Sequence, residues 1–203
     1  MKYIRANLLT PARNLCAAFS SSSPIPTLLT HFTHDPCPQA HEHGLPHLAS
    51  FLGRTFTGTD GVARYFEVMT SELGFEDMSF EPEAEWLVDT STMAVVIRGT
   101  AKFYAKRTGQ KWDEGFVYRL GIAEEVNEGV SGRGELKVQE YEVWADTGAA
   151  YLALNGRLGE VLSEEREGGT GGAGRTRRSQ DRKRSGCGEV VGSGMGAYGS
   201  CGQ

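Results

Sequence analysis

Apolar residues at helical spacing predict three helices within the first 74 residues. In the first helix, over residues 11–20, Thr10 and Pro11 are expected to supply the N-cap and the first helical position. A short second helix is expected over residues 27–32, and a third over residues 59–74. The apolar stripe of the third helix consists of Val62, Tyr65, Phe66 and Met69.

From residue 80 onward the pattern changes to alternation, which is typical of half-buried β-strands. Four strands are predicted, over residues 80–88, 93–106, 112–120 and 135–145, and a last helix over residues 149–158. Tyr141 and Val143 are expected to face the core, opposite Glu140 and Glu142. This order of helices, an antiparallel meander and a final helix predicts an α+β fold with helices on one face of a curved sheet.

Composition adds limits to this picture. The net charge is −5, which gives no sign of a nucleic-acid surface, and no apolar run approaches the roughly 20 residues of a membrane span. The four cysteines show no C-x-x-C spacing, so a reducing, cytoplasmic location is expected. Residues 161–203 lack periodicity and hold 12 of the 27 glycines, so they are expected to form a disordered Gly/Arg-rich tail.

The N-terminal residues 1–24 allow two interpretations. No acidic residue precedes Asp35, and the composition of this segment resembles a mitochondrial transit peptide. The favoured interpretation is a native helix, because its apolar residues recur at helical spacing. A mitochondrial location is therefore the alternative to the cytoplasmic one.

All five histidines lie between His31 and His47, in a stretch rich in proline. Four side chains there could supply zinc ligands in number and kind: Cys37, His41, His43 and His47. Their spacing matches no established zinc pattern, so no metal or other cofactor is predicted. If residues 40–44 are extended, Glu42 points to one side and His41 and His43 to the other, and only one of these sides can face a pocket.

Three segments carry a resemblance to a known superfamily: F-T-G-T-D-G-V-A-R-Y-F (56–66), T-G-Q-K-W-D-E-G-F-V-Y (108–118) and K-V-Q-E-Y-E-V-W-A-D (137–146). They resemble the nuclear-transport-factor-2-like superfamily, and within it the SnoaL-like proteins. E-H-G-L-P-H-L-A-S-F-L-G-R together with Y-E-V-W-A-D-T-G-A-A-Y-L-A is similar to an uncharacterised group of small fungal proteins. The resemblance covers about residues 10–158.

The resemblance implies a cone-shaped antiparallel sheet of four long strands and a short one, with N-terminal helices closing a pocket. The domain would span residues 25–160, between the N-terminal segment and the tail. The superfamily includes ketosteroid isomerase, polyketide cyclases, dehydratases and non-enzymatic binding modules, so the fold alone does not identify the function. In isomerase-like members the base is a carboxylate on the short extended segment before the G-x-x-x-V helix, which corresponds here to Glu42 or His43. The isomerase's tyrosine donor has no counterpart in residues 11–20, so the same steroid chemistry is not expected.

Other residues would complete the site. Asp146 is expected to cap the last helix, to act as an acid or base in the pocket, or both. Tyr118 could donate to a ligand oxygen, and a buried Glu114 would have a raised pKa. Aromatic residues at strand spacing are ordinarily core residues, but they can also line a ligand site. The expected ligand-binding residues are Tyr65, Trp86, Trp112, Glu114 and Phe116.

The favoured interpretation is a domain that binds a small apolar molecule. If it is an enzyme, it would be a cofactor-independent isomerase, cyclase or dehydratase. This interpretation predicts a closed pocket of several hundred Å³ with Glu42 or His43 on its wall. The alternative is a non-enzymatic binding module that forms a homodimer through its open sheet face.

Overall fold

The computed structural model describes residues 3–126, 134–161 and 163, so the predicted tail lies almost wholly outside the described residues. The helices are α1 (Arg5–Ser20), α2 (Ile25–Leu29), α3 (Gly58–Glu72) and α4 (Thr147–Leu154). The strands are β1 (Gln39–Glu42), β2 (Thr55–Thr57), β3 (Leu73–Phe80), β4 (Leu87–Asp89), β5 (Ala94–Ala105), β6 (Lys111–Glu124) and β7 (Leu136–Trp144).

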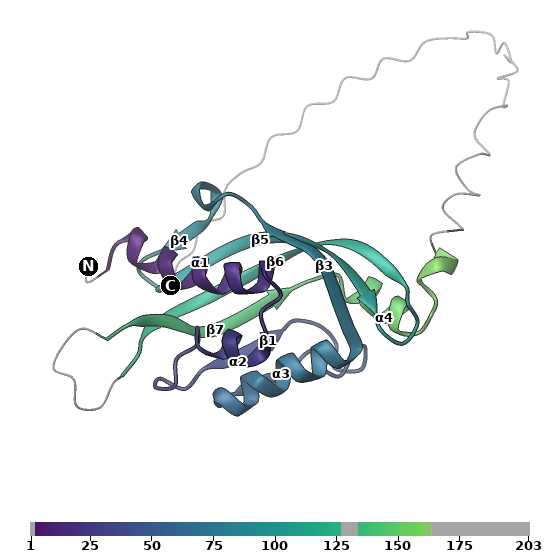
Figure 1. The fold of residues 1–203 in the computed structure, drawn as a ribbon, viewed down its shortest axis with the longest axis horizontal. Coiled ribbons are helices and arrows are strands. Elements are labelled where there is room, and N and C mark those ends of the chain that lie inside the picture. Colours follow the sequence, from purple (N-terminus) through teal and green to yellow (C-terminus); the bar gives the residue numbers. More distant parts are fainter. Residues whose placement is uncertain (1–2, 127–133, 162, 164–203) are drawn as a thin grey trace, which may run out of the picture.

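The strands form one curved sheet in the order β2-β1-β7-β6-β5-β3, with β4 also paired to β5. The helices α1, α2 and α3 lie over one face of it, and α4 lies at the end of the molecule away from the N-terminus (Figure 1). The predicted α+β class is confirmed, and the sheet is open. One detail of the prediction is wrong: the sheet is mixed, because β1 pairs with β7 in parallel.

The first helix is longer than the sequence predicts. It begins at Arg5, so Thr10 is not its N-cap and Pro11 lies inside it. The side chain of Asn7 accepts from the backbone N–H of Ile4 at 3.0 Å and thereby caps the earlier start. The second helix also begins earlier than predicted, directly after Pro24.

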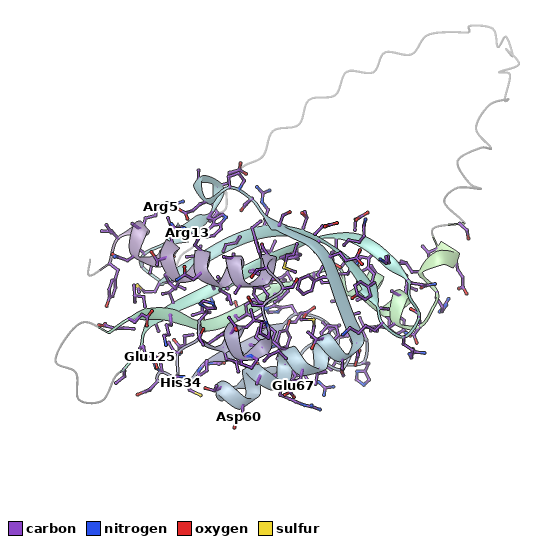
Figure 2. All side chains as sticks on the ribbon, viewed as in Figure 1. Arg5, Arg13, His34, Asp60, Glu67 and Glu125 are labelled. Atoms are coloured by element: carbon purple, nitrogen blue, oxygen red, sulfur yellow. The ribbon has the colours of Figure 1, made fainter. Side chains whose placement is uncertain are left out.

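The predicted strand over residues 80–88 is wrong. Strand β3 ends at Phe80, and a 3₁₀ turn (Glu83–Glu85) separates it from β4. Pro82 has no N–H to donate to a strand ladder, which favours this break. The turn is also held from outside: Arg13 pairs with Glu83 at 2.6 Å, and Arg5 donates to two backbone oxygens of the turn region (Figure 2). Such long-range contacts cannot be read from local alternation.

The core lies between the helices and the face of the sheet that they cover. Phe19 of α1 contacts Phe66 of α3 and Tyr118 and Tyr141 of the sheet, with ring centroids 5.7–5.8 Å apart. As predicted, Tyr141 and Val143 are buried on this face. The helix α1 is therefore an integral wall of the core. Within the described residues, no helix is long and apolar enough to cross a membrane.

Candidate functional site

A cavity of about 40 Å³ lies in this core, between the helices and strands β1, β3, β5, β6 and β7. Its volume corresponds to only a few water molecules. The predicted pocket of several hundred Å³ is therefore wrong, because eight aromatic side chains and two methionines occupy the space. The lining residues Phe75 and Thr147 are half-buried and Asp146 is exposed, so this end of the cavity lies near the surface.

Glu42 is placed on the cavity wall by the alternation of strand β1. Ala40 and Glu42 point into the core, and Glu42 is only 8% exposed. The Tyr65 hydroxyl of α3 donates to Oε2 of Glu42 at 2.6 Å. Burial raises the pKa of Glu42 from 4.5 to about 7, against the opposing effect of the Tyr65 hydrogen bond and with a further rise from the charge of Glu114. A carboxyl with this pKa is half-ionised near neutrality.

His43 lies outside the cavity, contrary to its candidacy as a catalytic base. It has the opposite parity to Glu42, and its ring stacks on Trp144 with centroids 4.1 Å apart and an angle of 9°. Trp144 is 41% exposed, so this pair belongs to the outer face of the sheet. Strand geometry thus places Glu42, and not His43, on the cavity wall, and the role of Glu42 as a base stays a prediction.

Glu114 is the second buried carboxylate of the cavity. Its two oxygens accept from the indole N–H of Trp112 and from the backbone N–H of Asp146, the latter at 2.6 Å. Burial raises its pKa, the two hydrogen bonds oppose this, and the charge of Asp146 adds to the rise. Glu114 therefore joins strand β6 to the start of α4 and contributes a second acidic group to the cavity.

The phenols of Tyr118 and Tyr141 complete the polar lining. Their ring centroids are 4.9 Å apart, and their hydroxyl groups are hydrogen-bonded to each other. A tyrosine is protonated at neutral pH, and burial raises the pKa of both phenols further. Each is therefore a proton donor in the cavity, and neither is a base. Sequence alternation identified Tyr141 only as a core residue.

Trp112, Phe116 and Tyr65 line the cavity, as the alternation and the helical stripe predicted. Trp86 does not. Its indole N–H donates to the backbone oxygen of Glu81 at 2.9 Å, and its own backbone oxygen accepts from Arg5. It is buried at the 3₁₀ turn because the strand predicted to carry it is interrupted there. The lining residues that sequence reasoning missed include Phe19, Met69, Phe75, Met78 and Phe103.

A neighbouring cleft of about 270 Å³ lies between the ends of α1, α2 and α3 and strand β3. It shares four lining residues with the cavity: Phe19, Met69, Leu73 and Phe75. These four residues therefore border both spaces. Met69 is unbranched and half-buried, so it is the side chain most easily moved to join them.

Asp146 caps helix α4. Its Oδ1 accepts from the backbone N–H groups of Gly148 and Ala149, both at 3.0 Å, while the side chain borders the cavity. Asp146→Ala is expected to lower the free energy of unfolding by about 1 kcal/mol, because two backbone donors lose their acceptor. Urea denaturation measures this change. Asp146→Asn keeps the acceptor and serves as the control; an equal loss in both variants would contradict the cap as the cause.

The histidine-rich segment does not assemble a metal site in the part of the chain that the structure describes. No three His, Cys, Asp or Glu side chains there are grouped closely enough to hold a metal ion. Cys37 is exposed, while the ring Nδ1 of His41 shares a hydrogen bond of 3.0 Å with the Thr55 hydroxyl.

No protein family matches the sequence in a scan, and no curated protein matches it either. Solved structures do match. A ketosteroid isomerase-like protein from Erwinia carotovora atroseptica is 18% identical, with 72% of this chain and 98% of that chain covered and a TM-score of 0.51. The chain has the nuclear-transport-factor-2-like fold. At such identity the likeness shows the fold alone.

Two further structures share this nuclear-transport-factor-2-like fold. PrhC from Penicillium brasilianum is 17% identical, with 78% of this chain and 92% of that chain covered and a TM-score of 0.51. A putative isomerase from Bacillus subtilis is 8% identical, with 74% and 94% covered and a TM-score of 0.54. Because the fungal structure is no more similar than the bacterial ones, the relation to a fungal group stays a prediction.

Proposed function

We propose that this domain binds a small, mainly apolar molecule in the buried cavity and catalyses a cofactor-independent proton transfer with Glu42 as the general base. The observation that carries the proposal is the single buried carboxyl with a pKa of about 7, held by Tyr65 at the cavity wall. A general base is most effective when its pKa lies near the operating pH. The fold, shared with a ketosteroid isomerase-like protein and a putative isomerase, supports this class of reaction.

The chemistry follows from the groups in place. A proton on a carbon next to a carbonyl group would move to Glu42, and the electron pair left behind would be delocalised onto the carbonyl oxygen. Tyr118 and Tyr141 are protonated and hydrogen-bonded to each other, which leaves one of their two protons free to stabilise this oxygen. Return of the proton from Glu42 to another carbon completes an isomerisation. In a dehydration the electron pair forms a C=C bond, the C–O bond of a neighbouring hydroxyl group breaks, and the proton from Glu42 joins the leaving hydroxide to give water. Tyr65 positions the base.

The test is exchange of carbon-bound protons in D₂O, followed by NMR with acetone and cyclopentanone, which match a small cavity. The protein is expected to accelerate exchange, with a rate that rises with pH through about 7 as Glu42 ionises. Glu42→Gln is expected to lower the rate by about 10²–10⁴-fold. Glu67→Gln, on the exposed side of α3, is the control and is expected to leave the rate unchanged (Figure 2). Equal exchange by the wild-type and Glu42→Gln proteins would exclude the proposal.

The alternative proposal is a dimeric binding module that uses the outer face of the sheet. That face has a groove of about 730 Å³, bordered by Trp144, Arg98 and Gly115. It also carries ion pairs, such as Arg119 with Glu140 at 2.8 Å, so it is more polar than an obligate interface. Light scattering tests the binding-module proposal, because a monomer in solution would exclude the homodimer.

A further inference from the structure

The described lining of the cavity has acidic side chains and no basic side chain to match them. Among the described residues that line it are three carboxylates, and none is Lys, Arg or His. Two of the three, Glu42 and Glu114, are 8% and 9% exposed. Buried carboxylates are ordinarily paired with a cation or bound to a metal, because an isolated buried charge is costly.

The partners of these two carboxylates are neutral. Glu114 is held by an indole N–H and a backbone N–H. Glu42 accepts from a phenol through Oε2, and its Oε1 has no hydrogen-bond partner in the described chain. The ion pairs found in the described residues, such as Arg13 with Glu83, lie elsewhere. Oε1 of Glu42, on a residue that is 8% exposed, is therefore available to a ligand at the cavity wall.

The rest of the wall is aromatic. Eight of the lining residues carry aromatic rings, among them Trp112, Tyr118 and Tyr141. The face of an aromatic ring attracts a cation, more strongly where water is excluded. Rings together with two buried carboxylates form a surface that favours an organic cation over a neutral group or an anion.

We propose that the ligand of this cavity carries a small positively charged group, of the alkylammonium class, that lies between Glu42, Glu114 and the aromatic rings. The proposal rests on the proposed function only in taking the same cavity as the ligand site. A cavity of about 40 Å³ accommodates a head group of a few heavy atoms. Movement of Met69 or Met78 at its edge provides the remaining room. A bound cation would also hold Glu42 in its ionised form, which is the form that acts as a base.

The direct test compares choline with 3,3-dimethylbutan-1-ol, which has the same shape without the charge. Calorimetric titration at pH 8 is expected to show that choline binds at least about tenfold more tightly. Glu42→Gln is expected to remove most of this preference, and Glu67→Gln to retain it. Equal affinity for the two compounds, or no binding of choline, overturns the proposal.

The pH dependence gives a second readout. Because the charge of choline is permanent, only the protein titrates, and the affinity is expected to rise as the pH increases through about 7. The titratable groups that face Glu42 across the cavity and its surroundings are Cys16 of α1, Tyr65 of α3, Glu114 and Tyr118 of β6, Tyr141 of β7, and Asp146. A flat affinity between pH 5.5 and 8 contradicts the proposal.

The two proposals fail separately. Exchange of acetone protons without any preference for choline would leave the proton-transfer function in place and overturn the cationic ligand. Charge-selective binding of choline without any proton exchange would support the ligand class and exclude the proposed catalysis.

Discussion

A chain that begins at Ile25 is expected not to fold. Removal of residues 1–24 takes away α1, whose side chains Leu8, Leu15 and Phe19 are 0–3% exposed in the core. Loss of a single buried Leu or Phe side chain costs about 2–5 kcal/mol. Together these losses are comparable to the roughly 5–15 kcal/mol by which a whole domain is stable. Far-UV circular dichroism and thermal denaturation measure the result.

The matched control removes residues from the other end. Residues 164–203 lack the apolar periodicity of a core element, so a chain ending at Ser163 is expected to unfold cooperatively like the full chain. The single variant Phe19→Ala tests the contribution of α1 to the core without truncation. Its free energy of unfolding is expected to fall by about 3–5 kcal/mol. A cooperative thermal transition of the chain that begins at Ile25 would show that α1 is dispensable and would favour the transit-peptide interpretation.

The second large effect is a dependence of stability on pH that arises from Glu42. Its pKa in the folded protein is about 7, above the 4.5 of an exposed carboxyl. The folded state therefore binds the proton more tightly than the unfolded state. The extra free energy of unfolding that this proton binding supplies is fully present below pH 4.5 and is lost as the pH rises through about 7. The difference between the two pKa values corresponds to about 3 kcal/mol of stability. Urea denaturation between pH 4 and 8 measures this change in the free energy of unfolding.

In Glu42→Gln this decline is expected to be largely absent, because the amide is neutral at every pH and its oxygen can still accept from Tyr65. The variant should therefore be more stable than the wild type at pH 8. Part of a decline remains, since burial also raises the pKa of Glu114. Glu67→Gln should behave as the wild type. If the stability of the wild type and of Glu42→Gln changed in parallel with pH, Glu42 would not be the buried titrating group.

Local sequence patterns correctly predicted the strands in which buried and exposed positions alternate. The alternation in β5, β6 and β7 correctly placed Trp112, Phe116 and Tyr141 on the core face. In β1 the resemblance limited the candidates to Glu42 or His43, and alternation implied that only one of them could face the pocket. The structure shows that the buried one is Glu42.

Features that depend on distant partners could not be predicted in this way. The interruption after Phe80 is held by arginines of α1, and the direction of β1 is set by β7. Trp86 was assigned to the ligand site because its strand was expected to continue. The size of the cavity depends on how eight rings pack against one another, which residue spacing does not encode.

The parallel pairing of β1 with β7 has a consequence for the order in which the molecule is assembled. Glu42 lies beside Val143, about 100 residues later in the chain. During synthesis β1 therefore leaves the ribosome long before its neighbour exists, and closing so long a loop has an entropic cost that slows folding. The acidic residue on which the proposed chemistry depends is thus made long before the strand that lies beside it, and its native surroundings are complete only when almost the whole domain has been made.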